Sequence, residues 1–202
     1  MPRSNAEDAR KRQLIDATIA AIAEVGFAQA TLAEIGRRAG ASPGLVAHYF
    51  ENKDGLLEAT MRRLVGALRR TVSARLAPLS GPRERIQAVI DTNLDAAEFD
   101  RRTAMVWIAF WSQVPHSPRL ARIQRAYQGR MESTLIHSFL AFTPRPEARR
   151  LASAVAAQID GLWLRAALSQ GEPEPAEAIA IASAFVDSQL ALLRLAQLRM
   201  ER

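Results

Sequence analysis

Gly40-Ala-Ser-Pro-Gly-Leu-Val-Ala-His-Tyr-Phe-Glu-Asn-Lys-Asp-Gly-Leu-Leu57 is the stretch that decides the fold, because its turn residues frame a short helix. Gly40 can adopt the left-handed conformation that ends a preceding helix. Ser42 is a favourable N-cap, and Pro43 then occupies the first helical position, where a missing N–H costs nothing. Turn chemistry in residues 51–55 ends this helix, and apolar residues at helical spacing start another. The stretch predicts a short helix from Pro43 between a tight turn and a longer helix.

A second short helix is predicted directly upstream. Thr31 can cap it, and Glu34 stands three residues later, which is the Thr-x-x-Glu pattern of a capping box. Leu32, Ile35 and Ala39 follow at helical spacing. Two short helices about a Gly-containing turn are typical of a helix-turn-helix, whose second helix enters the major groove of DNA. A plain helical hairpin inside a bundle is the alternative that the spacing leaves open.

The segment from Thr31 to Leu57 resembles the DNA-binding signature of TetR-type bacterial repressors at nearly every position. Stretches farther along, including Ala109-Phe-Trp and Ile159-Asp-Gly-Leu-Trp, resemble a branch of that family that responds to choline and controls glycine betaine synthesis. The similarity extends over about residues 10–190. It implies a dimeric repressor that binds double-stranded operator DNA at an inverted repeat and releases it when a small effector binds.

The resemblance and the turn spacing together predict which side chains face DNA. Eight residues are expected at this interface: Thr31, Ser42, Pro43, Gly44, Leu45, His48, Tyr49 and Lys53. Ser42, Gly44 and Leu45 are expected near base edges. The residues expected near phosphates are Thr31, His48, Tyr49 and Lys53. The alternative for Tyr49 is a core aromatic side chain.

Composition limits the possible classes of protein. The 202 residues are 49% hydrophobic, enough for a sizeable core, and the absence of cysteine excludes disulfides and thiolate chemistry. No signal peptide and no uninterrupted apolar run of membrane-spanning length is recognised, so a soluble, cytoplasmic protein is expected. The net charge of +6 is weak evidence for nucleic-acid binding, because residues 1–55 hold seven basic and seven acidic side chains and the surplus lies in residues 56–202.

The fold class expected is all-α and TetR-like. Residues 1–55 are predicted to form a three-helix bundle with the helix-turn-helix, and residues 56–202 a larger helical domain for ligand binding and dimerisation. The first helix is expected over residues 7–25, with Gly26 as its stop, and a long linking helix over residues 53–76. Helices of about 15 to 25 residues follow, separated by breaks at residues 78–82, 100, 115–118, 143–146 and 171–175.

The last two helices, predicted over residues 150–169 and 176–193, are small or apolar nearly all round. Such helices are covered on more than one side. The alternatives are a central core helix and a subunit interface, and the resemblance favours a homodimer through these two helices, with Ala156 and Ala184 in the interface. Two-fold symmetry would present two recognition helices to one face of DNA.

No catalytic motif is recognised, so an enzyme is not expected. The three histidines are separated by whole helices and belong to no metal-binding pattern. Asp91, Asp95 and Glu98 have the spacing of one helix face, which is more typical of a solvated face than of a catalytic pair. No metal and no cofactor are expected.

Two aromatic segments are the candidate ligand site. Trp107, Phe110 and Trp111 lie on one side of a predicted helix, and Asp160 and Trp163 share a face of another. Tryptophans at helical spacing are usually part of a core, which is the alternative here. The Asp160 carboxylate weighs against it, because a charge in a small and apolar helix needs a partner.

Three partners are possible for that carboxylate: Arg165, a helix terminus or a bound cation. Choline, a quaternary ammonium without an N–H, is held by ring faces and negative charge, and Phe99 and Tyr127 are further candidate rings. Choline or another quaternary ammonium is therefore the effector predicted. Two other functions stay open: a TetR-type repressor of an efflux or catabolic operon with a more apolar ligand, and a helical small-molecule-binding or scaffolding protein that does not bind DNA.

Overall fold

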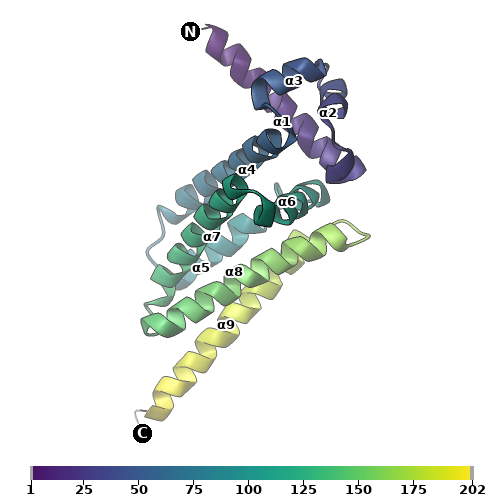
Figure 1. Ribbon diagram of the computed structural model, residues 1–202. Helices are drawn as coiled ribbons and strands as arrows, with labels where there is room; N and C mark the ends of the chain where they lie inside the picture. Colours follow the sequence, from purple (N-terminus) through teal and green to yellow (C-terminus); the bar gives the residue numbers. More distant parts are fainter. Residues whose placement is uncertain (1, 201–202) are drawn as a thin grey trace. The chain divides into compact units, whose positions relative to one another are not determined.

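A computed structural model describes residues 2–200, and all regular secondary structure in that range is helical (Figure 1). The bounds are α1 Pro2–Gln29, α2 Leu32–Arg38, α3 Pro43–Phe50, α4 Lys53–Leu76, α5 Pro82–Asn93, α6 Arg101–Gln113, the 3-10 turn η1 Val114–His116, α7 Pro118–Phe139, α8 Arg145–Leu168 and α9 Pro175–Met200. The all-α prediction is confirmed. The linking helix has the predicted bounds, residues 53–76.

The helices form two compact units. Unit 1 comprises Met1–Gly66 and Arg101–Ile123, and unit 2 comprises Ala67–Asp100 and Gln124–Arg202. The helix-turn-helix and α6 therefore share a unit, although α4 and α5 separate them in the sequence. The division into domains at residue 55 remains a prediction from the sequence.

Unit 1 has a core built from the helical faces that the sequence pattern predicts. α1 packs against α2 and α6, and α2 packs against α3. Leu14, Ile22, Ile35 and Val46 are buried in this core. Burial of large aliphatic side chains stabilises such a bundle by roughly 1.5–3 kcal/mol each. α1 is longer than predicted, because it starts at residue 2 and continues past Gly26.

Gly26 ends the first regular helix within α1, as predicted. Its backbone has φ 76° and ψ 164°, a non-helical conformation that favours glycine. A short second helical segment follows across this kink and continues to Gln29.

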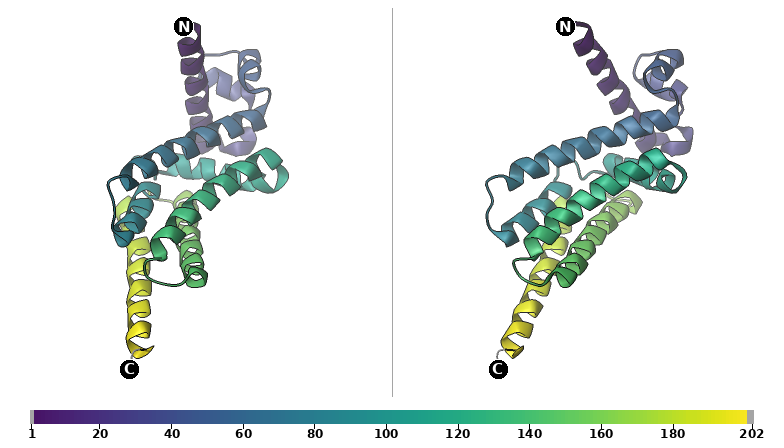
Figure 2. Two further views of the ribbon diagram at one scale, coloured as in Figure 1. Left: turned by 90° about the vertical axis from the view of Figure 1, so that its left-hand side faces the viewer. Right: turned by 60° about the vertical axis from the view of Figure 1, so that its left-hand side comes forward.

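Unit 2 contains α5, most of α7, α8 and α9. α9 packs against α8 and α5, and the views in Figure 2 show its C-terminal turns projecting past these neighbours. α8 contributes one wholly buried face, so the predicted interface residue Ala156 lies in the core of its own chain, whereas Ala184 of α9 is exposed. The prediction that Ala156 lies in the subunit interface is therefore wrong, because Ala156 packs inside its own chain.

Two helix predictions in the middle of the chain are wrong. α5 has 12 residues and α6 has 13, shorter than the 15 to 25 expected. α5 ends at Asn93, so Asp95 and Glu98 lie in the following turn and do not share a helix face with Asp91. The Asp95 carboxylate accepts a hydrogen bond from the Ala97 N–H, which favours a turn over continued helix.

Among the described residues, one helix has the length and apolar composition of a membrane span. It is α9, over Pro175–Arg199, and only 22% of its most apolar window is buried. Core helices of other proteins have the same composition, so this is weak evidence for a membrane. The exposed apolar side chains of α9 include Ile181, Leu192, Leu195 and Leu198.

Candidate functional site

The predicted recognition helix α3 is held by the capping contacts that its sequence encodes. The Ser42 hydroxyl accepts a hydrogen bond from the Leu45 N–H at 3.2 Å, and Pro43 is the first helical residue. Gly40 has φ +59°, which allows the tight turn after α2. Val46 and Phe50 are buried and fix one side of α3 to the core.

The opposite side of α3 is accessible. Ser42, Pro43, Gly44 and His48 are exposed, while Leu45 and Tyr49 are half-buried. A side chain added at Gly44 would meet no atom closer than the Ser42 hydroxyl at 4.0 Å. A recognition helix needs such a free surface to approach base edges.

The preceding helix α2 has only half of the predicted capping box. Thr31 accepts a hydrogen bond from the Glu34 N–H at 3.2 Å, but the Glu34 carboxylate bonds to Arg37 and Arg38 instead of the Thr31 backbone. The Arg38 side chain also pairs with Glu24 of α1 at 2.6 Å and is only 16% exposed. Arg38 therefore ties α2 to α1, whereas Arg37 is exposed. The sequence pattern predicts a solvated face for both arginines, which is wrong for Arg38.

Tyr49 lies among polar groups from two helices. Its ring centroid is 5.5 Å from that of His48, and the Lys11 ammonium of α1 lies 5.8 Å from the Tyr49 ring. Lys11 pairs with Glu7 at 2.9 Å, and this hydrogen-bonded pair raises the pKa of Lys11 and lowers the pKa of Glu7. Lys11 belongs to the run Arg10-Lys11-Arg12, which the sequence shows, but its approach to Tyr49 depends on the packing of α1 against the hairpin.

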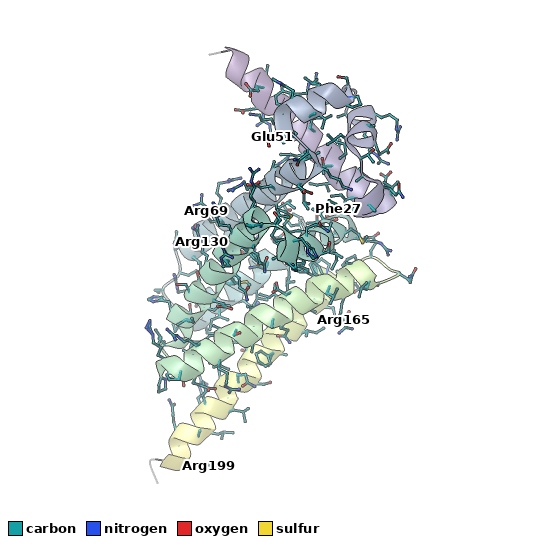
Figure 3. All side chains as sticks on the ribbon, in the orientation of Figure 1. Phe27, Glu51, Arg69, Arg130, Arg165 and Arg199 are labelled. Atoms are coloured by element: carbon teal, nitrogen blue, oxygen red, sulfur yellow. The ribbon has the colours of Figure 1, made fainter. Side chains whose placement is uncertain are left out.

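Lys53 has protein partners in this structure. Its ammonium donates hydrogen bonds to the carbonyl oxygens of Phe27 and Ala28, and it lies 4.1 Å from the centre of the Phe27 ring, which Figure 3 labels at the end of α1. Burial lowers the pKa of Lys53. The predicted phosphate contact of Lys53 remains a prediction, and the structure adds a role in closing the end of α1.

The charge surplus belongs to the unit that contains the helix-turn-helix. Unit 1 has 13 basic and 8 acidic side chains, which accounts for five of the six net positive charges. Residues 101–123 contribute four arginines and no acid. Along the sequence, the surplus of positive charge lies in residues 56–202. In the fold, the arginines of residues 101–123 belong to unit 1, so most of the surplus lies in the unit predicted to bind DNA. A positive unit attracts the phosphate backbone.

The first aromatic group lies on α6 in unit 1. The ring centroids of Trp107 and Trp111 are 5.5 Å apart, and those of Trp107 and Phe110 are 5.9 Å apart. Trp107 and Phe110 are buried, and Trp111 is half-buried. Trp107 thus contacts both of the other predicted rings of α6.

The second group lies in unit 2 around Trp163 of α8. Its ring meets that of Phe99 edge to face, with centroids 4.8 Å apart, and its indole N–H donates to the Asn93 carbonyl at 3.1 Å. The Tyr127 hydroxyl donates to the Asn93 side-chain oxygen at 3.2 Å. The structure therefore joins Trp163 to both rings that the sequence ranked lower. Asn93 was missed, because an asparagine at a helix end gives no sequence signal of this role.

Asp160, also on α8, has an unbonded carboxylate oxygen. Its Oδ1 atom is buried and has no hydrogen-bond partner among residues 2–200. Burial, with a smaller contribution from the negative charge of Glu132, raises the pKa of Asp160 to about 6. Arg165 is exposed and does not bond the buried Oδ1 atom of Asp160 in the described part of the chain. The pairing with Arg165 is thus wrong as an explanation of this carboxylate.

The two aromatic groups belong to different units, and a single ligand box made from both remains a prediction. A separate cavity of about 220 Å³ lies within unit 2, lined by Ala67, Leu68, Thr71, Arg75, Thr92, Asp95, Ala97 and Glu98. None of the predicted ligand residues lines it. No cluster of three or more potential metal ligands occurs in the described part of the chain.

Known protein families match both the N-terminal and the C-terminal part of the chain. The family model for bacterial regulatory proteins of the tetR family matches residues 14–60, and the model for the C-terminal part of BetI-type transcriptional repressors matches residues 82–191. The HTH-type transcriptional regulator BetI of Serratia proteamaculans is 44% identical over 94% of this chain and 97% of its own. BetI of Escherichia coli is 46% identical over 86% of this chain and 89% of its own.

Solved structures share the fold. A transcriptional regulator from Pseudomonas aeruginosa PAO1 has a TM-score of 0.77 and 26% identity, and covers 92% of each chain. A transcriptional regulator from Saccharomonospora viridis, solved in complex with choline, has a TM-score of 0.78 and 20% identity over 90% of this chain and 96% of its own. The scaffolding alternative without DNA binding does not fit these relatives. The chain therefore belongs to the TetR family of bacterial regulatory proteins, in its BetI-type branch, and is a DNA-binding transcriptional repressor and not an enzyme.

Proposed function

We propose that this repressor acts as a cytoplasmic homodimer that holds an inverted-repeat operator and releases it on binding choline. The observation that carries the effector assignment is the buried, unbonded Oδ1 atom of Asp160 on the helix that also presents Trp163. A buried carboxylate oxygen without a donor is costly, and a cation stabilises it. Choline supplies that charge in a form that aromatic faces hold by about 0.5–2 kcal/mol per ring.

The DNA contacts follow from the exposed side of α3. Gly44 and Ser42 leave room for base edges, and the polar groups around Tyr49 suit phosphate oxygens. The Lys11 ammonium, which pairs with Glu7, lies beside Tyr49 on the same surface. These features support the interface residues expected from the sequence, including Thr31, Leu45, His48 and Lys53.

The dimer is supported by apolar side chains that α8 and α9 leave exposed. On α8, Leu168 is 70% exposed and Leu164 is 43% exposed; on α9, Ile181 and Ala184 are exposed. Apolar area of this kind on two adjacent helices is stabilised by burial against a second subunit. A dimer would carry two recognition helices, which have to lie about 34 Å apart to enter successive major grooves.

The closest competing function is a repressor of an efflux or catabolic operon with a more apolar ligand. Asp160 favours a cation, because an apolar ligand would leave its carboxylate unbonded. Choline is the first compound to test, since the structural relative from Saccharomonospora viridis was solved with it. Genes for choline and betaine aldehyde oxidation are the expected targets.

The test is operator binding by the full-length protein, titrated with choline and with its uncharged carbon analogue, 3,3-dimethylbutanol. Choline should release the wild-type protein, and the analogue should not. The Asp160→Asn variant should keep its operator affinity and lose the response to choline. Equal release of the operator by both compounds, or a normal response of the Asp160→Asn protein to choline, would contradict the proposed cation site. Neither result would contradict the assignment as a repressor.

A further inference from the structure

Six basic side chains of unit 1 follow one another across its surface, and we call them the basic strip: Lys11, Arg12, Arg62, Arg63, Arg119 and Arg122. The strip begins beside the recognition helix, because the Lys11 ammonium lies 5.8 Å from the centre of the Tyr49 ring. Arg12 comes next on α1, and its carbonyl oxygen accepts a hydrogen bond from Arg63 of α4 at 3.2 Å. The strip therefore passes from α1 to α4.

The basic strip continues from α4 to the beginning of α7. Arg62 pairs with Glu58 of the same helix at 2.8 Å, and Arg119 of α7 lies 3.8 Å from the other oxygen of that carboxylate. Arg122 stands three residues after Arg119, so the two side chains share a face of α7. Both are exposed, with 66% of the Arg119 side chain accessible. Close contacts thus connect the recognition helix to α7 within one unit.

The basic strip carries a surplus of positive charge. Its six cations face three acids, Glu7, Asp16 and Glu58, which pair with four of them. The other two cations, Arg12 and Arg122, form no ion pair in the part of the chain that the structure describes. Three net positive charges on one exposed surface attract a polyanion.

We propose that the basic strip binds the phosphate backbone of DNA that flanks the operator, outside the half-site that α3 contacts. This inference rests on the proposed operator contact of α3 and extends the DNA-binding surface of unit 1 along α1 and α4 to α7. Tyr49, expected at a phosphate, lies where the two surfaces meet. Arginine suits this partner, because its planar guanidinium can donate two hydrogen bonds to one phosphate.

Flanking DNA has to bend toward unit 1 to reach α7. Bending a duplex costs free energy, and the additional contacts that the bend permits offset that cost. Contacts with phosphates carry no sequence information directly. The basic strip should therefore add affinity and lengthen the protected region of DNA without changing which half-site is preferred.

The experiment uses an operator core selected from a pool of random duplexes. The full-length protein is titrated with this core alone and with about 15 base pairs of unrelated sequence added at each end, or one and a half helical turns. At low salt the flanks should raise the affinity of the wild type at least tenfold. They should also steepen its salt dependence by about three to four units, since two arginines from each subunit of the dimer make four phosphate contacts.

A double variant on α7 tests the cause. Arg119→Gln with Arg122→Gln should lose both effects of the flanks and should bind the core as the wild type does. The matched control is Arg145→Gln with Arg149→Gln, which removes two exposed arginines one turn apart from α8 in unit 2. This control should keep both effects.

Three results overturn the inference and leave the proposed contacts of α3 in place. The wild type could gain nothing from the flanks, the α7 variant could keep the gain, or a folded α7 variant could also lose affinity for the core, which would make the basic strip part of the operator contact itself. If the α7 variant does not fold, hydroxyl-radical footprinting of the wild type decides, because protection confined to the core overturns the inference. A selected core that is not an inverted repeat contradicts the proposed function instead, and the comparison of flanked and unflanked duplexes still tests the basic strip.

Discussion

The ammonium of Lys53 donates a hydrogen bond to the Ala28 carbonyl oxygen at 3.1 Å, so the first residue of α4 closes the end of α1. Lys53→Ala should have two effects. The salt dependence of operator binding should fall by about one unit in slope, as expected for one lost phosphate contact. The melting temperature should also fall, because the half-buried Phe27 carbonyl and the Ala28 carbonyl lose their shared donor.

Arg165→Ala is the control for this variant, since it removes an exposed positive charge from unit 2. It should change neither the slope nor the melting temperature. If the salt dependence of operator binding is unchanged in Lys53→Ala, the proposed phosphate contact is wrong. If the melting temperature is unchanged, the structural role of Lys53 is wrong.

Two glycines of the helix-turn-helix should respond oppositely to alanine. At Gly44 the new methyl group has open space, so Gly44→Ala should fold with equal or greater stability, by up to about 1 kcal/mol, and should bind operator at least tenfold more weakly. At Gly36 the methyl group would lie 2.6 Å from the Ala41 carbonyl oxygen, so Gly36→Ala should lose stability itself. Thermal melts and operator titrations of both variants check this. Full operator affinity of Gly44→Ala would show that α3 does not approach base edges there.

Asp160 predicts a pH dependence for both stability and effector binding. Its pKa is raised from 3.8 to about 6, so the protonated form stabilises the folded chain below pH 4, and that contribution is lost as the pH rises through 6. Choline requires the ionised form, so its affinity should fall up to tenfold per pH unit below 6. Melting and choline titrations from pH 4 to 8 measure both effects. The Asp160→Asn protein should lose both dependences, and a wild-type choline affinity that is constant across pH 5 to 8 would contradict the assignment.

Local chemistry explains what the sequence could predict. The start of α3 depends on Gly40, Ser42 and Pro43, and the start of α4 depends on the turn residues that precede it; such preferences act over a few residues, and both starts are predicted correctly. Asn93 accepts a hydrogen bond from Trp163, 70 residues away, and Lys53 donates one to Ala28, 25 residues away. No spacing rule predicts contacts between residues so far apart in the sequence. The same reason explains the placement of α6 in unit 1, which only tertiary packing against α1 determines.

The dimer can be tested with residues of contrasting burial. Leu164→Glu and Ala184→Glu place a charge on exposed positions of α8 and α9, so they should give folded monomers with weak operator binding. Ala156→Glu places a charge in the core of one chain and should reduce folding itself. Sedimentation gives the mass and circular dichroism the helix content. A wild-type monomer at micromolar concentration would contradict the proposed dimer.

Trp163 allows the contribution of its ring face to be separated from that of its apolar volume. Trp163→Phe keeps a ring that can face a cation and loses the N–H bond to Asn93, whereas Trp163→Leu keeps apolar volume without a ring. Loss of one cation–π contact is worth about 0.5–2 kcal/mol, so choline should bind Trp163→Leu roughly 2- to 30-fold more weakly than the wild type. Trp163→Phe should fall between them, because phenylalanine is a weaker cation partner than tryptophan. Operator affinity without effector should be unchanged in both, since Trp163 lies in unit 2 and the hairpin in unit 1. A Trp163→Leu protein that is released by choline at the wild-type concentration would show that the ring does not hold the cation.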